Sequence, residues 1–183
     1  MLLVPVVIAV AWTQIYYYFF SSIQSDSARY QLLVKAVQIA RDHFPFGAGF
    51  GTYGSYFSTV YYSFLYHIYN LSGVHGLGYG SSYFVSDNFW PMILGETGWI
   101  GLLLIIGAMG ILFVEIQKIR KISISHNFAG ICMFVYLLIS SSAEAAFVHP
   151  VAVPLAVWLG GLFAQKNQVR STQREKLFIL FMD

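Results

Sequence analysis

The chain has 183 residues, of which 57% are hydrophobic and 18% aromatic, whereas only 10% are charged. Soluble domains usually carry about 25% charged residues, so this composition is typical of a membrane protein. The net charge is only +2, and no cluster of lysines and arginines alternates with aromatic residues, so the chain lacks the pattern of a nucleic-acid-binding protein.

Four apolar runs predict transmembrane helices. Residues 1–20 contain no charged residue and are long enough to cross a bilayer. They have neither a basic n-region nor an A-x-A cleavage site, so a transmembrane helix is favoured over a cleaved signal peptide. The other three runs cover residues 90–114, 128–142 and 151–164, and the last two form a hairpin, 128–164, around the turn "SSSAEAAFVHP". The predicted fold is therefore all-α: a polytopic membrane protein with about four transmembrane helices.

The placement of basic residues predicts the orientation. Seven of the ten lysines and arginines lie in two segments, the loop 115–127 and the tail 165–183. The four-helix topology puts both segments on one side, which the positive-inside rule makes cytoplasmic. The loop 21–89 is then extracytoplasmic, and we expect a multi-pass protein whose active face is outside the cell membrane.

The first part of this loop, "SDSARYQLLVKAVQIARDHFP", predicts a helix that begins near Asp26 or Ser27 and ends before Pro45. Its polar stripe consists of Gln31, Lys35, Gln38 and Asp42. Arg29 lies nearly opposite this stripe, on the apolar face. One interpretation is that Arg29 binds an anion together with the free amides of the helix N-terminus. The alternative is that it extends to lipid headgroups.

Two glycine-rich tracts follow. The tract "HFPFGAGFGTYGSYFS" contains Gly49, Gly51 and Gly54 at the spacing of a dinucleotide fingerprint, but it follows a helix rather than a strand, so we reject that function. We expect the glycines to allow tight turns with close backbone approach. The second tract, "SGVHGLGYGSS", predicts a mobile surface loop. The many aromatic residues between Tyr53 and Trp90 fit a sugar-stacking surface and a membrane-interfacial helix equally well.

Cysteine and histidine suggest no metal site. Cys132, the single cysteine, lies in an apolar run and is expected to be a small buried side chain. No pair among the five histidines shows metal-ligand spacing, so no zinc site or other metal site is predicted.

The stretch "SDNFWPMILGETGWIGLLL", residues 86–104, carries two acids at the edge of an apolar helix. A charge at membrane depth costs roughly 2.5–3.5 kcal/mol, so each acid requires an explanation. For Asp87, a helix N-cap and a catalytic carboxylate are equally supported. For Glu96, a structural explanation is favoured: "GETG" forms a helix break, and Glu96 makes an interhelical hydrogen bond.

The order of these motifs resembles the O-antigen ligase and polymerase superfamily. An R-x3-L helix at Arg29–Leu33 is followed by "HFPFGAGFG" and then by "DN" eight residues before "ETGWIGLLL", and the resemblance covers about residues 21–113. These proteins are bacterial glycosyltransferases of the inner membrane that use undecaprenyl-diphosphate-linked glycans. The resemblance implies that such a glycan and the lipid bilayer are the partners, and that no cofactor is needed.

The resemblance also implies roles for individual residues. Arg29 matches the arginine that contacts the lipid-linked pyrophosphate. Asp87 occupies the position of the histidine that is the proposed base of the ligases. This departure favours the polymerase branch over the alternative of an O-antigen ligase acting on lipid A–core. Candidate substrate-binding residues are Arg41, His43, Asn88 and Glu96.

A further alternative is a non-catalytic membrane subunit or a transporter fragment, although no internal repeat of the kind found in transporters is visible. Members of the superfamily usually have more spans than the four predicted here. We therefore expect the chain to be part of a larger enzyme, inactive alone if part of the lipid channel is missing. The missing helices or other polysaccharide-assembly proteins would then be partners.

Overall fold

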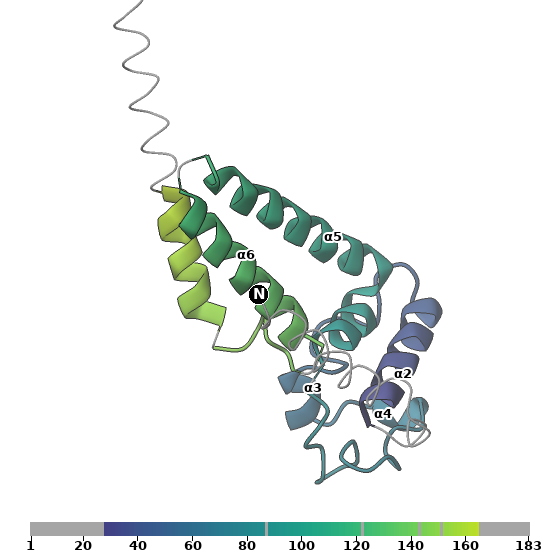
Figure 1. Cartoon of the computed structure of the whole chain (residues 1–183). Coiled ribbons are helices and arrows are strands. Elements are labelled where there is room, and N and C mark those ends of the chain that lie inside the picture. Colours follow the sequence, from purple (N-terminus) through teal and green to yellow (C-terminus); the bar gives the residue numbers. More distant parts are fainter. Residues whose placement is uncertain (1–27, 87, 122, 143, 151, 165–183) are drawn as a thin grey trace, which may run out of the picture. The chain divides into compact units, whose positions relative to one another are not determined.

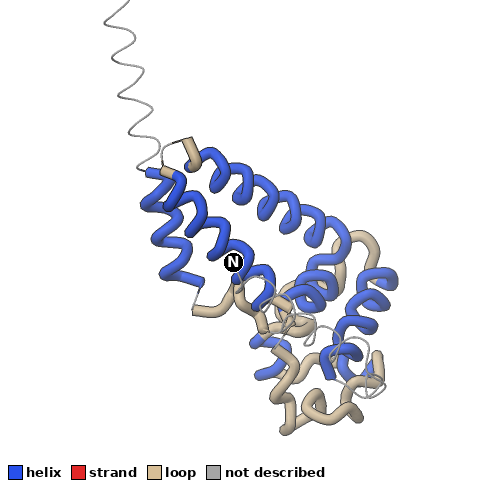
Figure 2. The backbone as a smooth tube through the Cα atoms, in the orientation of Figure 1, coloured by secondary structure: helices blue, strands red, loops and turns tan. Residues whose placement is uncertain are grey.

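The computed structural model describes residues 28–164 except residues 87, 122, 143 and 151. The described residues form helices joined by loops, and they contain no strand (Figure 2). The all-α prediction is thus confirmed for this part of the chain. The predicted first span, residues 1–20, and the predicted tail, residues 165–183, lie outside the described residues. The chain divides into two compact units, and each is described by itself.

The first unit covers residues 28–103 and 142–145 of the described chain. It contains α2 (Ala28–Asp42), α3 (Tyr56–Val60), α4 (Leu65–Ile68) and the first part of α5 (Phe89–Ile119) (Figure 1). The predicted helix of the loop is therefore α2, and its expected capping residues, Asp26 and Ser27, lie outside the described residues. One apolar face of α2 packs into the core of this unit. The buried core residues are Leu32, Ala36, Ile39, Ala40, Tyr53, Tyr66, Tyr69, Leu71, Leu77, Val85 and Leu94.

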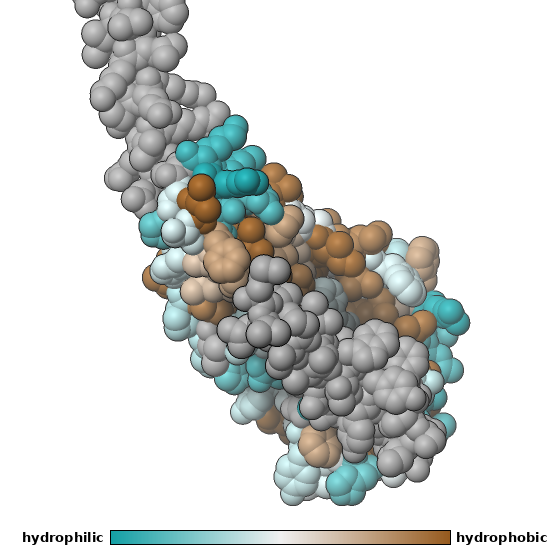
Figure 3. Space-filling view, viewed as in Figure 1, coloured by the Kyte–Doolittle hydropathy of each residue, from teal (hydrophilic) through white to brown (hydrophobic). Residues whose placement is uncertain are grey.

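The helix α5 is long and apolar enough to cross a membrane. A core helix of a soluble protein would be mostly buried, whereas almost none of the apolar window of α5 is. Figure 3 shows apolar side chains gathered along this helix. Exposed aliphatic residues include Leu103, Leu104, Ile106, Ile111 and Val114. Because exposed apolar patches of this kind mark membrane or partner contacts, α5 supports the assignment to a membrane protein.

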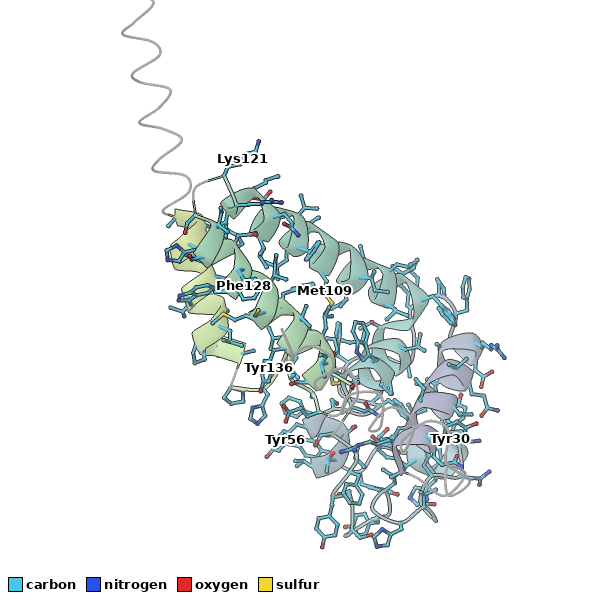
Figure 4. All side chains as sticks on the ribbon, viewed as in Figure 1. Tyr30, Tyr56, Met109, Lys121, Phe128 and Tyr136 are labelled. Carbon is cyan, nitrogen blue, oxygen red and sulfur yellow. The ribbon has the colours of Figure 1, made fainter. Side chains whose placement is uncertain are left out.

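The second unit packs the later part of α5 against α6 (Ile124–Ser140) and the helix Ala152–Ala164. Its small core consists of Ile116, Phe134 and Leu159. Figure 4 shows Met109 on the side of α5 that faces α6, whereas Phe128 points away from that contact. Both shorter helices are apolar but fall below the usual spanning length. Among the described residues, α5 alone reaches that length, so the predicted number of four spans is not confirmed.

The expectation that Cys132 is buried is wrong, because its side chain is exposed. Gly130 and Phe134 are buried on the face of α6 that packs in the second unit. Cys132 is two residues from each, which places it about 200° around the helix from both. The apolar neighbours of Cys132 in the sequence did not reveal which face of α6 it occupies.

The second glycine-rich tract, residues 72–82, is a loop, as predicted, but it is partly anchored in the core. Leu77 is fully buried, and its carbonyl oxygen accepts a hydrogen bond from the Tyr62 hydroxyl at 3.0 Å. The ends of a short turn in this tract meet in an isolated bridge between Gly78 and Ser81.

Candidate functional site

The first glycine-rich tract docks onto a break in α5. At Gly98 the backbone leaves the helical region, with φ 66° and ψ −163°. The Ala48 amide donates to the Gly95 carbonyl at 2.9 Å, and the Gly49 amide donates to the Glu96 carbonyl at 2.9 Å. Carbonyl groups freed by a helix break must find other partners when they are buried. Here the loop supplies those partners.

Glycine is required at two positions of the docked loop. A Cβ atom added to Gly47 would lie 2.5 Å from the Gly98 nitrogen, and one added to Gly54 would lie 3.0 Å from the Met92 Cα atom. Both loop glycines have positive φ angles, 73° and 71°. The expectation of tight turns with close backbone approach is therefore confirmed.

Glu96 is buried and holds the loop through its side chain. Its Oε1 atom accepts a hydrogen bond from the Tyr53 amide at 3.1 Å. The helix break expected at "GETG" is therefore present, but the partner of Glu96 is a loop amide and not a neighbouring helix. The Tyr53 hydroxyl in turn donates to the Leu32 carbonyl of α2 at 2.6 Å. Tyr53 thus connects α2 to the break in α5.

A second buried tyrosine, Tyr66 of α4, supports the same loop. Its ring stacks on that of Tyr53 with centroids 5.8 Å apart. Its hydroxyl accepts a hydrogen bond from the Gly54 amide at 2.9 Å and lies 2.8 Å from the Ser58 hydroxyl. Burial raises the pKa of Tyr66 to about 12, with a smaller increase from nearby Glu96, against the lowering effect of the two hydrogen bonds.

This pKa predicts a loss of stability in alkali. Because the pKa of folded Tyr66 lies above the ordinary value of 10.0, the unfolded chain releases the proton first. The contribution of the neutral Tyr66 hydroxyl to the free energy of unfolding is therefore complete below about pH 10 and is lost as the pH rises towards about 12. We expect Tyr66→Phe to weaken this alkaline loss, measured by thermal unfolding in detergent across that range. Tyr83→Phe, at an exposed position, is the control and should leave the alkaline loss as in the parent; equal curves for the two variants would contradict the prediction.

The predicted site residues of α2 and the segment after it differ in burial and lie at opposite ends of the helix. Arg29 is half-buried in the first turn of α2, whereas Arg41, in its last turn, is exposed. His43 is exposed just after α2, with Nδ1 3.1 Å from the Ile39 carbonyl oxygen. Arg29 thus lies at one end of the helix Ala28–Asp42, and Arg41 and His43 lie at or just beyond the other end, about 20 Å away at 1.5 Å rise per residue.

The remaining candidates lie at the start of α5. Asn88 is buried just before the helix, and its carbonyl oxygen accepts a hydrogen bond from the Met92 amide at 3.4 Å. Asp87 lies outside the described residues. The hydrogen bonds through Tyr53 join Glu96 to the helix that carries Arg29. Arg41, His43 and Asn88 take no part in those two bonds.

Sequence reasoning missed Tyr53 and Tyr66, which organise the site. The one available signal was the position of Tyr53 between Gly51 and Gly54, in a tract already expected to turn tightly. No group of three or more His, Cys, Asp or Glu side chains that could hold a metal ion occurs within the described residues.

The chain shows no significant match to a protein-family profile, to a curated protein or to a solved structure.

Proposed function

We propose that the chain is the C-terminal portion of a bacterial membrane glycosyltransferase that polymerises undecaprenyl-diphosphate-linked glycan at the outer face of the inner membrane. One observation carries this proposal. The R-x3-L helix, the glycine-rich tract and the "ETG" segment, whose order resembles the O-antigen ligase and polymerase superfamily, meet in one core through Tyr53 and Glu96. Three motifs that are separate in the sequence thus form one structural unit.

In the proposed reaction the acceptor sugar hydroxyl attacks the anomeric carbon of the lipid-linked glycan. The bond between that carbon and the diphosphate oxygen breaks, and undecaprenyl diphosphate leaves. Asp87 accepts the hydroxyl proton, and Arg29 stabilises the charge on the departing diphosphate. Arg41, His43 and Asn88 are secondary candidates for contacts with the diphosphate or the sugars.

The orientation in the membrane is part of the proposal. In this topology α5 is one of four spans, and the loop 21–89 faces outward. Lys118, in the last turn of α5, and Arg120 and Lys121, just beyond it, are exposed, as expected for a cytoplasmic boundary.

The test is complementation of a strain that lacks its polymerase, with this segment restored to a full-length parent and the surface glycan displayed as a ladder on a gel. We expect Arg29→Ala to abolish the ladder while the protein stays inserted and abundant. Lys35→Ala is the matched control, because it removes the same charge from the polar stripe of the same helix. A normal ladder from Arg29→Ala would contradict the assignment of Arg29 to the diphosphate.

Asp87→Asn separates catalysis from helix capping in the same assay. Asparagine caps helices about as well as aspartate but cannot accept the proton. General-base catalysis contributes roughly 10²–10⁴-fold, so we expect Asp87→Asn to lose the ladder as fully as Asp87→Ala. If Asp87→Asn restores a normal ladder, Asp87 is only a cap. Transfer of single units to lipid A–core without a ladder would instead identify a ligase.

A further inference from the structure

The first unit contains a long stretch, residues 43–86, without charged side chains. No Asp, Glu, Lys or Arg occurs between Asp42 and Asp87. Surfaces of soluble proteins are rich in charged side chains, yet this stretch exposes many large apolar ones. The exposed aromatic residues between these acids are Phe44, Phe46, Phe50, Tyr56, Phe57, Tyr61, Phe64, Tyr79, Tyr83 and Phe84.

Three of these residues lie in the loop that docks at the break of α5. Phe44, Phe46 and Phe50 are 71%, 70% and 86% exposed. They are held in place by the backbone, because the Pro45 carbonyl accepts the Ile100 amide at 3.4 Å and Gly47 packs directly on Gly98. The phenylalanines are therefore fixed beside α5 and are not carried on a free loop.

Their position along α5 indicates what covers them. Beyond the break, the next turns of α5 expose Ile100 and Leu103, at 40% and 67%. The loop thus lies level with the beginning of the exposed apolar part of the membrane-length helix. The Pro45 carbonyl oxygen bonds to the Ile100 amide, one turn before Leu103, so a bilayer that covers Leu103 would lie close to the level of this loop.

Lipid fits these three side chains better than sugar does. A sugar site combines an aromatic ring with polar groups that fix the hydroxyls. Phenylalanine has no polar atom, and Phe44 and Phe46 flank a proline that has no amide hydrogen to donate. Tyr79 and Tyr83, in the loop after α4, are a different case, because their hydroxyls can bind water or a glycan.

We propose that Phe44, Phe46 and Phe50 insert into the outer lipid interface beside α5 and fix the glycine-rich loop at the depth of the headgroups. This rests on the membrane-spanning α5 of the proposed function but not on glycosyl transfer. Since Tyr53 links this loop to α2, the anchor also fixes the height of the helix that carries Arg29. The diphosphate of a lipid-linked glycan lies at the same depth.

The test measures depth directly. In a Cys132→Ser background, Phe46→Cys is labelled with an environment-sensitive fluorophore, and the full chain is reconstituted in vesicles of phosphatidylethanolamine and phosphatidylglycerol. We expect a blue-shifted emission that is quenched by lipids carrying a shallow spin label and protected from iodide in the water. Phe50→Cys repeats the measurement at a second exposed position.

Two control variants place the cysteine at exposed positions outside the loop that docks on α5. Tyr79→Cys tests an aromatic residue of similar exposure in the loop that follows α4, a segment with no hydrogen bond to the break in α5 among those of the described backbone. Gln38→Cys tests the exposed polar stripe of α2. Both should be quenched by iodide. Iodide quenching at position 46 equal to that at position 79 would overturn the proposal and favour a sugar-facing surface.

The depth and the activity are separable. If the label at position 46 lies in lipid but the unmutated parent produces no glycan ladder, the proposed function is contradicted and this inference stands. If the label at position 46 is exposed to water but the parent produces a normal glycan ladder, this inference is contradicted and the proposed function stands.

Discussion

Replacing Gly98 with alanine is expected to reduce the free energy of unfolding by roughly 2–6 kcal/mol. The backbone of Gly98 has φ 66° and ψ −163°, a region that is almost exclusive to glycine and costs a residue with a Cβ atom roughly 1–3 kcal/mol. The added Cβ would also collide with the Pro45 carbonyl oxygen and lie 2.5 Å from the Gly47 nitrogen. These are backbone atoms of the docked loop, so they cannot move aside as a side chain could. The loop would have to leave the break in α5.

Gly107→Ala is the matched control for this prediction. Gly107 lies in the same helix, and no heavy atom lies within 4 Å of a Cβ added there. Alanine favours a helix over glycine by about 1 kcal/mol, so this variant should equal or exceed the parent in stability. The measurement is the fraction of monodisperse protein that survives heating in detergent. Equal survival of Gly98→Ala and Gly107→Ala would show that the break in α5 is not needed for the fold.

The long helices α2 and α5 were predictable because their signals are local, whereas the short helices α3 and α4 were not predicted. The spacing of the polar stripe on α2 defines a helix without knowledge of its partners. The apolar run of α5 likewise predicts a helix, but its end was expected at residue 114, and the helix continues to Ile119. The polar residues after the run end the apolar surface but favour helix, and Glu115 pairs with Lys118 one turn later. Hydropathy thus located the apolar, membrane-length segment but not the end of the helix.

The centre of the candidate site was only partly predictable. The sequence indicated a helix break at Glu96 and tight turns in the glycine-rich tract, and both are present. It did not indicate that Glu96 binds the Tyr53 amide, because these residues are 43 positions apart and no periodic pattern links them. The turns themselves decide which amide reaches the carboxylate. Long-range contacts of this kind depend on backbone angles that only the folded chain defines.

Glu96→Ala is expected to remove the link between the loop and α5. The Tyr53 amide would lose its acceptor inside the core, where an unsatisfied donor costs about 1–3 kcal/mol, and the lost side chain would leave a cavity as well. We expect lower survival on heating in detergent and a shortened or absent glycan ladder in the complemented strain. Normal survival of this variant would contradict the structural role of the bond.

Glu96→Gln then decides between positioning and direct chemistry at Glu96. Glutamine keeps an oxygen that accepts the Tyr53 amide and has nearly the same shape, but it carries no charge and cannot accept a proton. If Glu96 is a positioning residue, Glu96→Gln should restore both thermal survival and the ladder. Restored survival without the ladder would mean that the carboxylate itself binds substrate or takes part in the reaction. Because the loop held by Glu96 also carries Tyr53, which contacts α2, the first result would connect the break in α5 to the placement of Arg29.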